Sequence, residues 1–246
     1  MSDEQYDSLI DYAKAKYPKN KQILEGHTTI DVSSNTSKSK VTLPYEMWSM
    51  DKIKPDTYEL TKWTTKYKGP YVLTGKLDGV SCLYVSPNKL YTRGNGKIGQ
   101  DVSGMLPYLR LPKEHGIVIR GELIIKKALF QEKYSKEFSN PRNFVAGVVN
   151  QKMPHTDRLS SISFVAYELI QPIVKQSEQL KLLGDMDVET VQYEMTGNLS
   201  SELLSKTLDS WKTNSAYEMD GLICCNDSVY SRRSGNPEHA FAFKTM

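Results

Sequence analysis

Short runs of apolar or alternating apolar and polar residues fill much of the chain after Gly69-Pro70, and they predict β-strands. The runs are Tyr71–Thr74, Val80–Ser86, Leu90–Thr92, Gly116–Ile125, Ser163–Ile170, Gly221–Cys225 and Ala240–Lys244. Their connections are too irregular for repeated β-α-β units, and the chain has no internal repeat. The pattern therefore predicts an α+β fold of mainly antiparallel sheets.

Apolar residues recur at helical spacing in four other stretches. The first covers residues 2–17, begins with the spacing of a capping box and ends before a proline. The second covers Asp56–Tyr67, where Asp56 supplies a cap. Two more, Lys126–Phe138 and Ser201–Trp211, interrupt the strands and predict helices that flank the sheets.

A stretch rich in serine and threonine, residues 26–40, separates the first helix from everything that follows. Such a composition is typical of a surface loop or linker. We therefore expect a short helical module with its linker over residues 1–40 and a larger domain over residues 41–246.

The composition is that of a globular protein of 246 residues, with 39% hydrophobic residues and a net charge of +3. This balance excludes a disordered tail or a rod. No apolar run approaches the roughly 20 residues of a membrane span, and the acidic N-terminus is unlike a signal peptide. The three cysteines, Cys82, Cys224 and Cys225, suggest neither a disulfide framework nor a zinc site. We expect an intracellular, cytoplasmic protein without a membrane partner.

Two lysines and several acidic residues fall at the ends of the predicted strands. Lys76 and Asp78 lie in a Lys-x-Asp-Gly turn, Glu122 ends a buried strand, Asp220 opens another, and Lys244 closes the last. Alone, Lys-x-Asp-Gly predicts only a hairpin turn with exposed side chains. Together, in one order along the chain, these residues suit nucleotidyl transfer.

In nucleotidyl transfer a lysine amine attacks the α-phosphate of a nucleotide and forms a phosphoramidate. The amine has to be neutral to attack, and a neighbouring cation, here Lys244 or Arg93, together with a divalent metal ion would favour that form. Carboxylates would hold the metal ion, directly or through water, and the ribose hydroxyls. Cationic side chains would stabilise the charge that develops on the phosphate.

This ordered set resembles the covalent nucleotidyltransferases (DNA ligases, RNA ligases and capping guanylyltransferases), and most of all the adenylation domain of NAD⁺-dependent DNA ligases. Asn140–Gly147 is similar to a signature of the NAD⁺ branch that ATP-dependent ligases do not share. Tyr91–Gly96 with Gly99–Val102, Ser2–Leu9 and Met47–Asp51 resemble further segments of that branch. The resemblance covers nearly the whole chain and implies a covalent nucleotidyltransferase (ATP-grasp-like) fold after a nicotinamide-binding N-terminal module.

The resemblance also implies roles for individual residues. Lys76 would be the nucleophile that carries AMP, and it would act with Asp78, Glu122 and Lys244. The implied cofactor-binding residues are Asp3, Tyr6, Asp7, Ser49, Met50, Thr74, Lys76, Leu77, Gly79, Arg93, Glu122, Arg142, Tyr167, Asp220 and Lys244. Mg²⁺ or Mn²⁺ would be held, through water, by Asp78, Glu122 and Asp220.

Within that set, Tyr167 would stack on adenine, while Arg93 and Arg142 would face the ribose, the phosphates or the nick. The three N-terminal residues would contact the nicotinamide mononucleotide half of NAD⁺. Ser49 and Met50 would lie at the edge of the nucleotide site. Glu218 would join Asp220 as an acid of the family's fourth motif.

The sequence departs from the family at three positions: Thr74 stands where the family has Glu, Asn150 where it has Arg, and Cys225 where it has Lys. These departures leave the nucleophile intact but change phosphate affinity and donor choice. In the family an aromatic–histidine pair precedes the segment of Asp3, and an OB-fold follows the segment of Lys244. The sequence holds neither, so we expect it to form the enzyme–AMP adduct and to seal nicks poorly.

We therefore predict a monomeric adenylation domain in which Lys76 attacks NAD⁺, releases nicotinamide mononucleotide and passes AMP to the 5′-phosphate of nicked double-stranded DNA. An ATP-dependent DNA or RNA ligase core is one alternative. A catalytically silent module that binds nucleotides or nucleic acid is another. The Lys/Ser/Tyr-rich composition is typical of a large DNA virus or an AT-rich bacterium.

Overall fold

The computed structural model describes residue 16, residues 40–55 and residues 57–244. The chain divides into two compact units, Met1–Thr36 and Ser37–Met246, and the second contains all the elements discussed below. The first predicted helix, with Asp3, Tyr6 and Asp7, lies outside the described residues except for residue 16. The predicted domain boundary at residue 40 stays a prediction.

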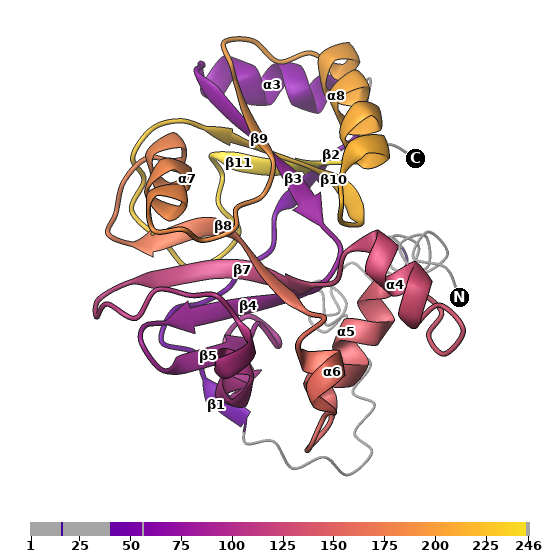
Figure 1. The fold of residues 1–246 in the computed structure, drawn as a ribbon. Coiled ribbons are helices and arrows are strands. Elements are labelled where there is room, and N and C mark those ends of the chain that lie inside the picture. The colour runs from indigo at the N-terminus through magenta and orange to yellow at the C-terminus, as the bar shows by residue number, and fades with distance from the viewer. Residues whose placement is uncertain (1–15, 17–39, 56, 245–246) are drawn as a thin grey trace. The chain divides into compact units, whose positions relative to one another are not determined.

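A five-stranded sheet lies in the upper part of Figure 1. Its strands are β2 (Asp51–Ile53), β3 (Tyr71–Leu77), β9 (Tyr193–Thr196), β10 (Met219–Asn226) and β11 (Ala240–Phe243), in the spatial order β2-β11-β10-β3-β9. Only the pair β11–β2 is parallel. This sheet carries Lys76, Asp220 and the strand that leads to Lys244.

A four-stranded antiparallel sheet lies below it in the same view. Its strands are β4 (Val80–Val85), β5 (Lys89–Thr92), β7 (Val118–Ile124) and β8 (Ser163–Gln171), in the order β5-β4-β7-β8. A two-stranded ribbon joins β1 (Lys40–Thr42) to β6 (Ile98–Gln100). The prediction of an α+β fold with mainly antiparallel sheets is confirmed.

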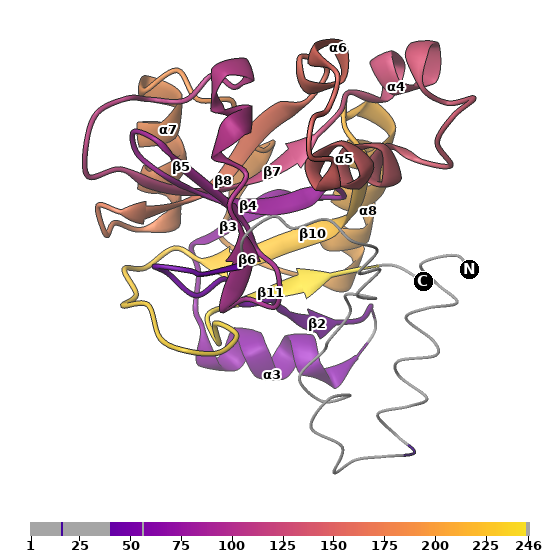
Figure 2. The same cartoon turned by 90° about the horizontal axis from the view of Figure 1, so that it is seen from below.

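Helices cover the outer faces of both sheets (Figures 1 and 2). They are α3 (Tyr58–Lys66), the 3₁₀ helix η1 (Ser103–Tyr108), α4 (Lys127–Lys133), α5 (Pro141–Asn150), α6 (Thr156–Leu159), α7 (Gln176–Asp185) and α8 (Ser201–Asn214). Helices α3 and α8 bury Leu60 and Leu208 against the five-stranded sheet. Helices α5 and α7 bury Phe144 and Leu183 against the four-stranded sheet. The remaining, inner faces of the two sheets therefore form the walls of the candidate site.

The inner faces touch directly over only part of their area. Val72 of β3 packs with Ile124 of β7 and Val165 of β8 in one apolar cluster. Beyond this cluster the facing side chains include charged residues, and those of one sheet act electrostatically on those of the other. None of the helices in the described part is both long enough and apolar enough to cross a membrane.

Several predicted boundaries are wrong. The helix expected over Lys126–Phe138 ends at Lys133, and a separate helix, α5, follows. Helix α3 begins at Tyr58 and has Thr57 at its N-cap position without a side-chain capping bond, while Asp56 lies outside the described residues. Helix α5 begins where it does because the Asn140 side chain accepts a hydrogen bond from the backbone N–H of Asn143 and Pro141 occupies the first turn.

Candidate active site

Two lysines share one carboxylate between the sheets. The Nζ of Lys76, on β3, lies 2.8 Å from Oδ1 and 3.1 Å from Oδ2 of Asp220. The Nζ of Lys244, which follows β11, lies 2.7 Å from Oδ2 of the same residue. Three segments far apart in sequence therefore place two amines on one carboxylate, as their positions at strand ends predict.

Strand pairing explains this convergence. Lys76 lies opposite Gly221 in the β3–β10 register, and an irregularity between Met219 and Gly221 lets Asp220 turn toward the lysines. A Cβ at Gly221 would lie 2.5 Å from the carbonyl oxygen of Phe243, so only glycine allows β10 and β11 to approach this closely. Burial works against ionisation of Asp220, but Lys76 and Lys244 prevail and hold its pKa below the usual value.

Glu122 lies on the facing sheet with only 7% of its surface exposed. Its Oε1 accepts a hydrogen bond of 3.2 Å from the backbone N–H of Gly79. Burial raises the pKa of Glu122 to about 7, although Lys76 and Arg142 act in the opposite direction. Glu122 is therefore a carboxyl group that titrates near neutral pH beside the candidate nucleophile.

Arg142 fixes the turn that follows Lys76. Its Nη1 donates to Oδ1 of Asp78 and to the carbonyl oxygen of Gly79, both at 2.9 Å. The backbone N–H of Asp78 donates in turn to the carbonyl oxygen of Glu218. The Glu218 side chain itself is exposed and lies outside the cluster. The first turn of α5 thus delivers a cation to the Lys-x-Asp-Gly turn, in the segment that carries the resemblance to the NAD⁺ branch.

Tyr167 lies farther along the same cleft, beside a second charged group. Its hydroxyl is hydrogen-bonded to the Ser81 hydroxyl, and the Arg120 guanidinium carbon lies 5.5 Å from its ring centroid. Arg120 pairs with Glu168 at 3.0 Å and donates to the carbonyl oxygen of Trp48 at 3.1 Å. Burial raises the pKa of the Tyr167 hydroxyl, so the ring stays neutral.

The remaining candidates lie at varying distances from this cleft. Thr74 is buried on β3, two residues before Lys76 and so on the same face. Burial lowers the pKa of Arg93, whose charge acts on Tyr167 and Glu122. Leu77 packs into the apolar clusters of the sheet rather than against the charged residues. In the segment between β1 and β2, Ser49 is exposed and Met50 is half-buried.

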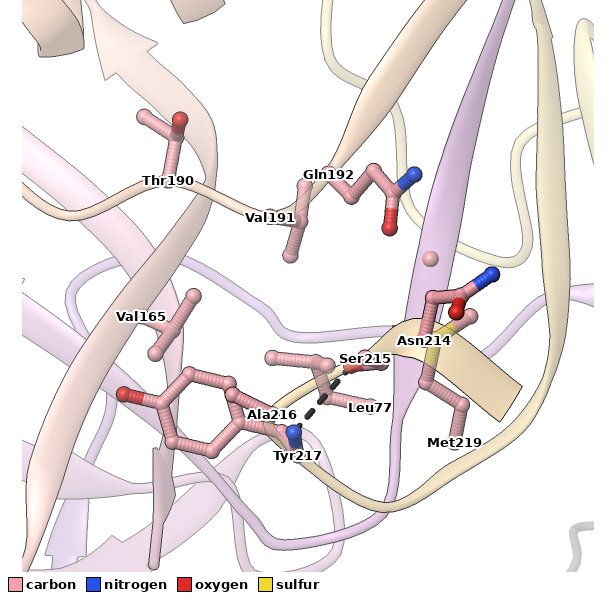
Figure 3. Close-up of a pocket in the computed structure, with 11 residues that line it drawn as sticks. Leu77, Val165, Thr190, Val191, Gln192, Asn214, Ser215, Ala216, Tyr217 and Met219 are labelled. Atoms are coloured by element: carbon pink, nitrogen blue, oxygen red, sulfur yellow. Dashed lines mark hydrogen bonds between the residues drawn. The ribbon is translucent and has the colours of Figure 1, made fainter. Parts of the chain in front are cut away.

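A separate cavity of about 190 Å³ adjoins the nucleophile strand. It is lined by residues of β3, the segment before β9 and the turn between α8 and β10, among them Gly75, Leu77, Gln192, Asn214 and Tyr217 (Figure 3). Its lining includes both sequence neighbours of Lys76 but not Lys76 itself. Lys76, Asp220 and Lys244 are not among the residues that line this cavity.

The carboxylates do not form a complete cage for a metal ion: within the described ranges, no group of three His, Cys, Asp or Glu side chains is arranged to hold one. Asp220 and Glu122 still fit Mg²⁺, which is commonly bound through one or two carboxylates, water and substrate phosphates. Asp78, the third carboxylate expected to hold the metal ion, pairs with Arg142, as Asp220 pairs with the two lysines.

The sequence interpretation missed Ser81, Arg120, Glu168 and Arg232 as contributors to this cleft. Arg120 has a detectable signal, because it precedes Glu122 by two residues on a strand and must share its face. Arg232 has none, since it lies in an irregular segment between β10 and β11 and reaches the cleft only through its pairing with Glu168.

Solved structures with a similar fold are ligases. A Lig E DNA ligase superposes with a TM-score of 0.50 at 17% identity, covering 80% of this chain and 69% of that chain. An archaeal ATP-dependent RNA ligase superposes with a TM-score of 0.52 at 11% identity, covering 81% of this chain and 48% of that chain. At such identities the likeness shows the fold alone, and the fold is that of ligase nucleotidyltransferase domains.

The sequence comparisons specify the branch. Residues 35–245 match the family model of the NAD-dependent DNA ligase adenylation domain. The chain belongs to this family, as the resemblance implied.

Viral and bacterial DNA ligases are among the relatives. A DNA ligase of Acanthamoeba polyphaga mimivirus is 38% identical over 99% of this chain and 39% of its own length. Putative DNA ligase 205R of Invertebrate iridescent virus 6 is 39% identical over 84% of this chain and 36% of its own length. A DNA ligase of Lachnoclostridium phytofermentans is 27% identical over 99% of this chain and 41% of its own length. The chain thus spans about two-fifths of the length of these curated relatives.

Proposed function

We propose that Lys76 attacks the α-phosphate of NAD⁺, forms a covalent lysyl-AMP and releases nicotinamide mononucleotide. AMP then passes to the 5′-phosphate of nicked double-stranded DNA, the substrate suggested by the names of the relatives. The observation that carries the proposal is the Asp220 carboxylate, which holds the amines of Lys76 and Lys244 side by side. One amine would attack and the other would neutralise the phosphate.

The chemistry balances with groups in the cleft. A bond forms between Nζ of Lys76 and the α-phosphorus, and the bond from that phosphorus to the bridging oxygen of nicotinamide mononucleotide breaks. The Lys76 ammonium loses one proton before the attack and a second as the phosphoramidate forms, and both leave to solvent, to which the side chain is 31% exposed. Lys244 and Arg142 stabilise the negative charge that grows on the phosphate oxygens.

Other residues bind and orient the nucleotide. Tyr167 stacks on adenine, and Glu122 accepts a hydrogen bond from a ribose hydroxyl, with Arg93 on the ribose side. Asp220 and Glu122 would hold Mg²⁺ or Mn²⁺, which would supply charge neutralisation at the reacting phosphate. Thr74 and Gly79 line the cleft, and Leu77 supports it from the neighbouring core. Asp3, Tyr6 and Asp7 contact the nicotinamide half, and Ser49 and Met50 lie at the edge of the nucleotide site.

We further propose that the protein acts inside the cell as a monomer, with residues 41–246 as its adenylation domain. Its described cysteines are free and buried, which suits a reducing compartment.

Intact-protein mass spectrometry tests the proposal. The protein is first treated with nicotinamide mononucleotide and with pyrophosphate to remove any AMP it carries. It is then incubated with Mg²⁺ and either NAD⁺ or ATP, beside Lys76→Ala. A gain of one AMP with NAD⁺ alone, absent in the variant, is the expected result. A gain with ATP alone would assign the chain to ATP-dependent chemistry, and no gain with either would contradict the proposal.

A further inference from the structure

The strand that carries Tyr167 contains a bulge at that residue. In the β7–β8 register, Arg120 lies opposite Glu168 and Gly121 lies opposite Ala166, which leaves Tyr167 as the extra residue. A bulge breaks the alternation of a strand, so two successive side chains can face the same side. The contacts of Arg120 with both Tyr167 and Glu168 show that both side chains face the cleft.

The carboxylate of Glu168 lies between two arginines. Arg120 is buried and pairs with Oε2, while Nη1 of Arg232 pairs with Oε1. Nη2 of Arg232 donates to the carbonyl oxygen of Glu46, which ties the segment between β10 and β11 to the segment before β2. Arg120 therefore fixes Glu168, whereas the Glu168 and Arg232 side chains remain 22% and 31% exposed and accessible to a ligand.

On the opposite wall of the cleft, the positions of Thr74 and Cys225 carry no charge. Thr74 on β3 and Cys225 on β10 face the same side, since Thr74 lies opposite Ile223 and Cys225 is two residues further along that strand. Burial raises the pKa of the Cys225 thiol to about 12, and the charges of Glu168 and Asp227 act in the same direction. The thiol is neutral, so Glu168 and its arginines are the charged groups beside Tyr167.

We propose that Glu168 and Arg232 recognise the edge of the base that stacks on Tyr167. The inference rests on the proposed function, because that function places a base on Tyr167. A carboxylate beside a guanidinium matches adenine, whose exocyclic amine donates and whose neighbouring ring nitrogen accepts a hydrogen bond. Hypoxanthine presents the reverse order, with a carbonyl oxygen and a ring N–H. Arg232 has five N–H donors and Glu168 about four acceptor positions, so both can bind a base while keeping their present partners.

Binding of AMP and IMP to unreacted protein, measured by titration calorimetry, tests the inference. The wild type is expected to bind AMP at least about tenfold more tightly than IMP, the scale of one charge-assisted hydrogen bond. Arg232→Ala should weaken AMP binding about tenfold, change IMP binding little and so remove the preference. Arg233→Ala, a loss of the same charge at the exposed neighbouring residue, is the matched control and should behave as the wild type.

Two further measurements keep the test decisive. If Arg232→Ala lowers the melting temperature, Arg232→Lys keeps the charge and should give an intermediate preference in a stable protein. In single-turnover adenylation with NAD⁺ and its hypoxanthine analogue, Arg232→Ala should raise the NAD⁺ concentration that gives half the maximal rate of lysyl-AMP formation and leave that maximal rate within twofold. Equal wild-type affinity for AMP and IMP, no binding of either, or an unchanged preference in Arg232→Ala would overturn the inference. A preference that Arg232 controls, without lysyl-AMP formation, would overturn the proposed function alone.

Discussion

The two ends of the cleft are built in different ways. At the phosphate end, Lys76, Asp220 and Lys244 come from strand ends and meet through regular strand pairing. At the base end, Tyr167 and Glu168 depend on a bulge, and Arg232 arrives from an irregular segment.

This difference separates chemistry from recognition. The phosphate end keeps Lys76, Asp220 and Lys244, which the resemblance implies, whereas the base end has Thr74 and Cys225 on one wall and an Arg–Glu–Arg group on the other. The comparison therefore predicts that substitutions at the phosphate end affect the rate of adenylation. Substitutions at the base end should affect nucleotide affinity and stability.

The largest effect is expected for Lys76→Arg, compared with Lys244→Arg at the other lysine that pairs with Asp220. A guanidinium stays protonated and cannot attack phosphorus, so Lys76→Arg should lower the rate of lysyl-AMP formation by at least about a thousandfold. Lys244→Arg keeps the charge that the phosphate needs and should cost only about tenfold. Single-turnover measurements with labelled NAD⁺ would show the difference, and equal losses would remove the distinction between attacking and stabilising amines.

Glu122 gives the next largest effect, on stability. Its pKa is raised from 4.5 in an unfolded chain to about 7 in the fold, so the folded state holds the proton more tightly between these values. The stability that this group contributes is therefore complete below pH 4.5 and is lost as pH rises through 7, by about 3 kcal/mol. Between pH 4.5 and a pH above 7, the free energy of unfolding of the wild type should fall by this amount relative to that of Glu122→Gln, as measured by denaturation at several pH values. Parallel curves would contradict the assignment.

Asp220→Asn should lower the rate of adenylation about a hundredfold, because the amide removes the charge that holds both lysines in place. Glu218→Gln is the matched control: it changes an exposed acid two residues earlier and should leave the rate near that of the wild type. Mass spectrometry after timed exposure to NAD⁺ measures both. A strong loss of rate in Glu218→Gln would show that Glu218 takes part in adenylation.

The smallest predicted effect lies at the base end. Arg120→Met fills a similar volume but removes the buried pairing with Glu168 and the hydrogen bond to the carbonyl oxygen of Trp48. We expect a loss of about 2 kcal/mol in the free energy of unfolding, moderated because Glu168 keeps Arg232. Arg110→Met breaks an exposed ion pair and should change the urea midpoint little. Equal midpoints for the two variants would show that Arg120 does not support this end.

The sequence predicted the longer strands and the phosphate end because both depend on local pattern. Every strand run proposed after Gly69-Pro70 is present in the described part, with shifted ends. Strands β1, β2, β6 and β9 were missed because they are short and mostly exposed, so they show no apolar run, unlike the equally short but buried β5 and β11. Helix α5 was missed because Gly147 and three valines weaken its helical pattern.

The base end was harder to predict because its geometry depends on distant pairings. Regular alternation places Tyr167 and Glu168 on opposite faces of β8, and the bulge that reverses this has no signature in one sequence. The pairing of Arg232 with Glu168 joins residues 64 positions apart. Sequence reasoning therefore singled out Lys76, Asp220 and Lys244, which the structure brings together, but not the group that we assign to the base.

A crystal structure of the protein after reaction with NAD⁺ would test the central claim most directly, because it would show both ends of one bound nucleotide. We predict continuous density from Nζ of Lys76 to phosphorus, adenine stacked on Tyr167, and its amine within hydrogen-bonding distance of Glu168. Density for AMP on another residue, or a base turned away from Tyr167 and Glu168, would contradict the account.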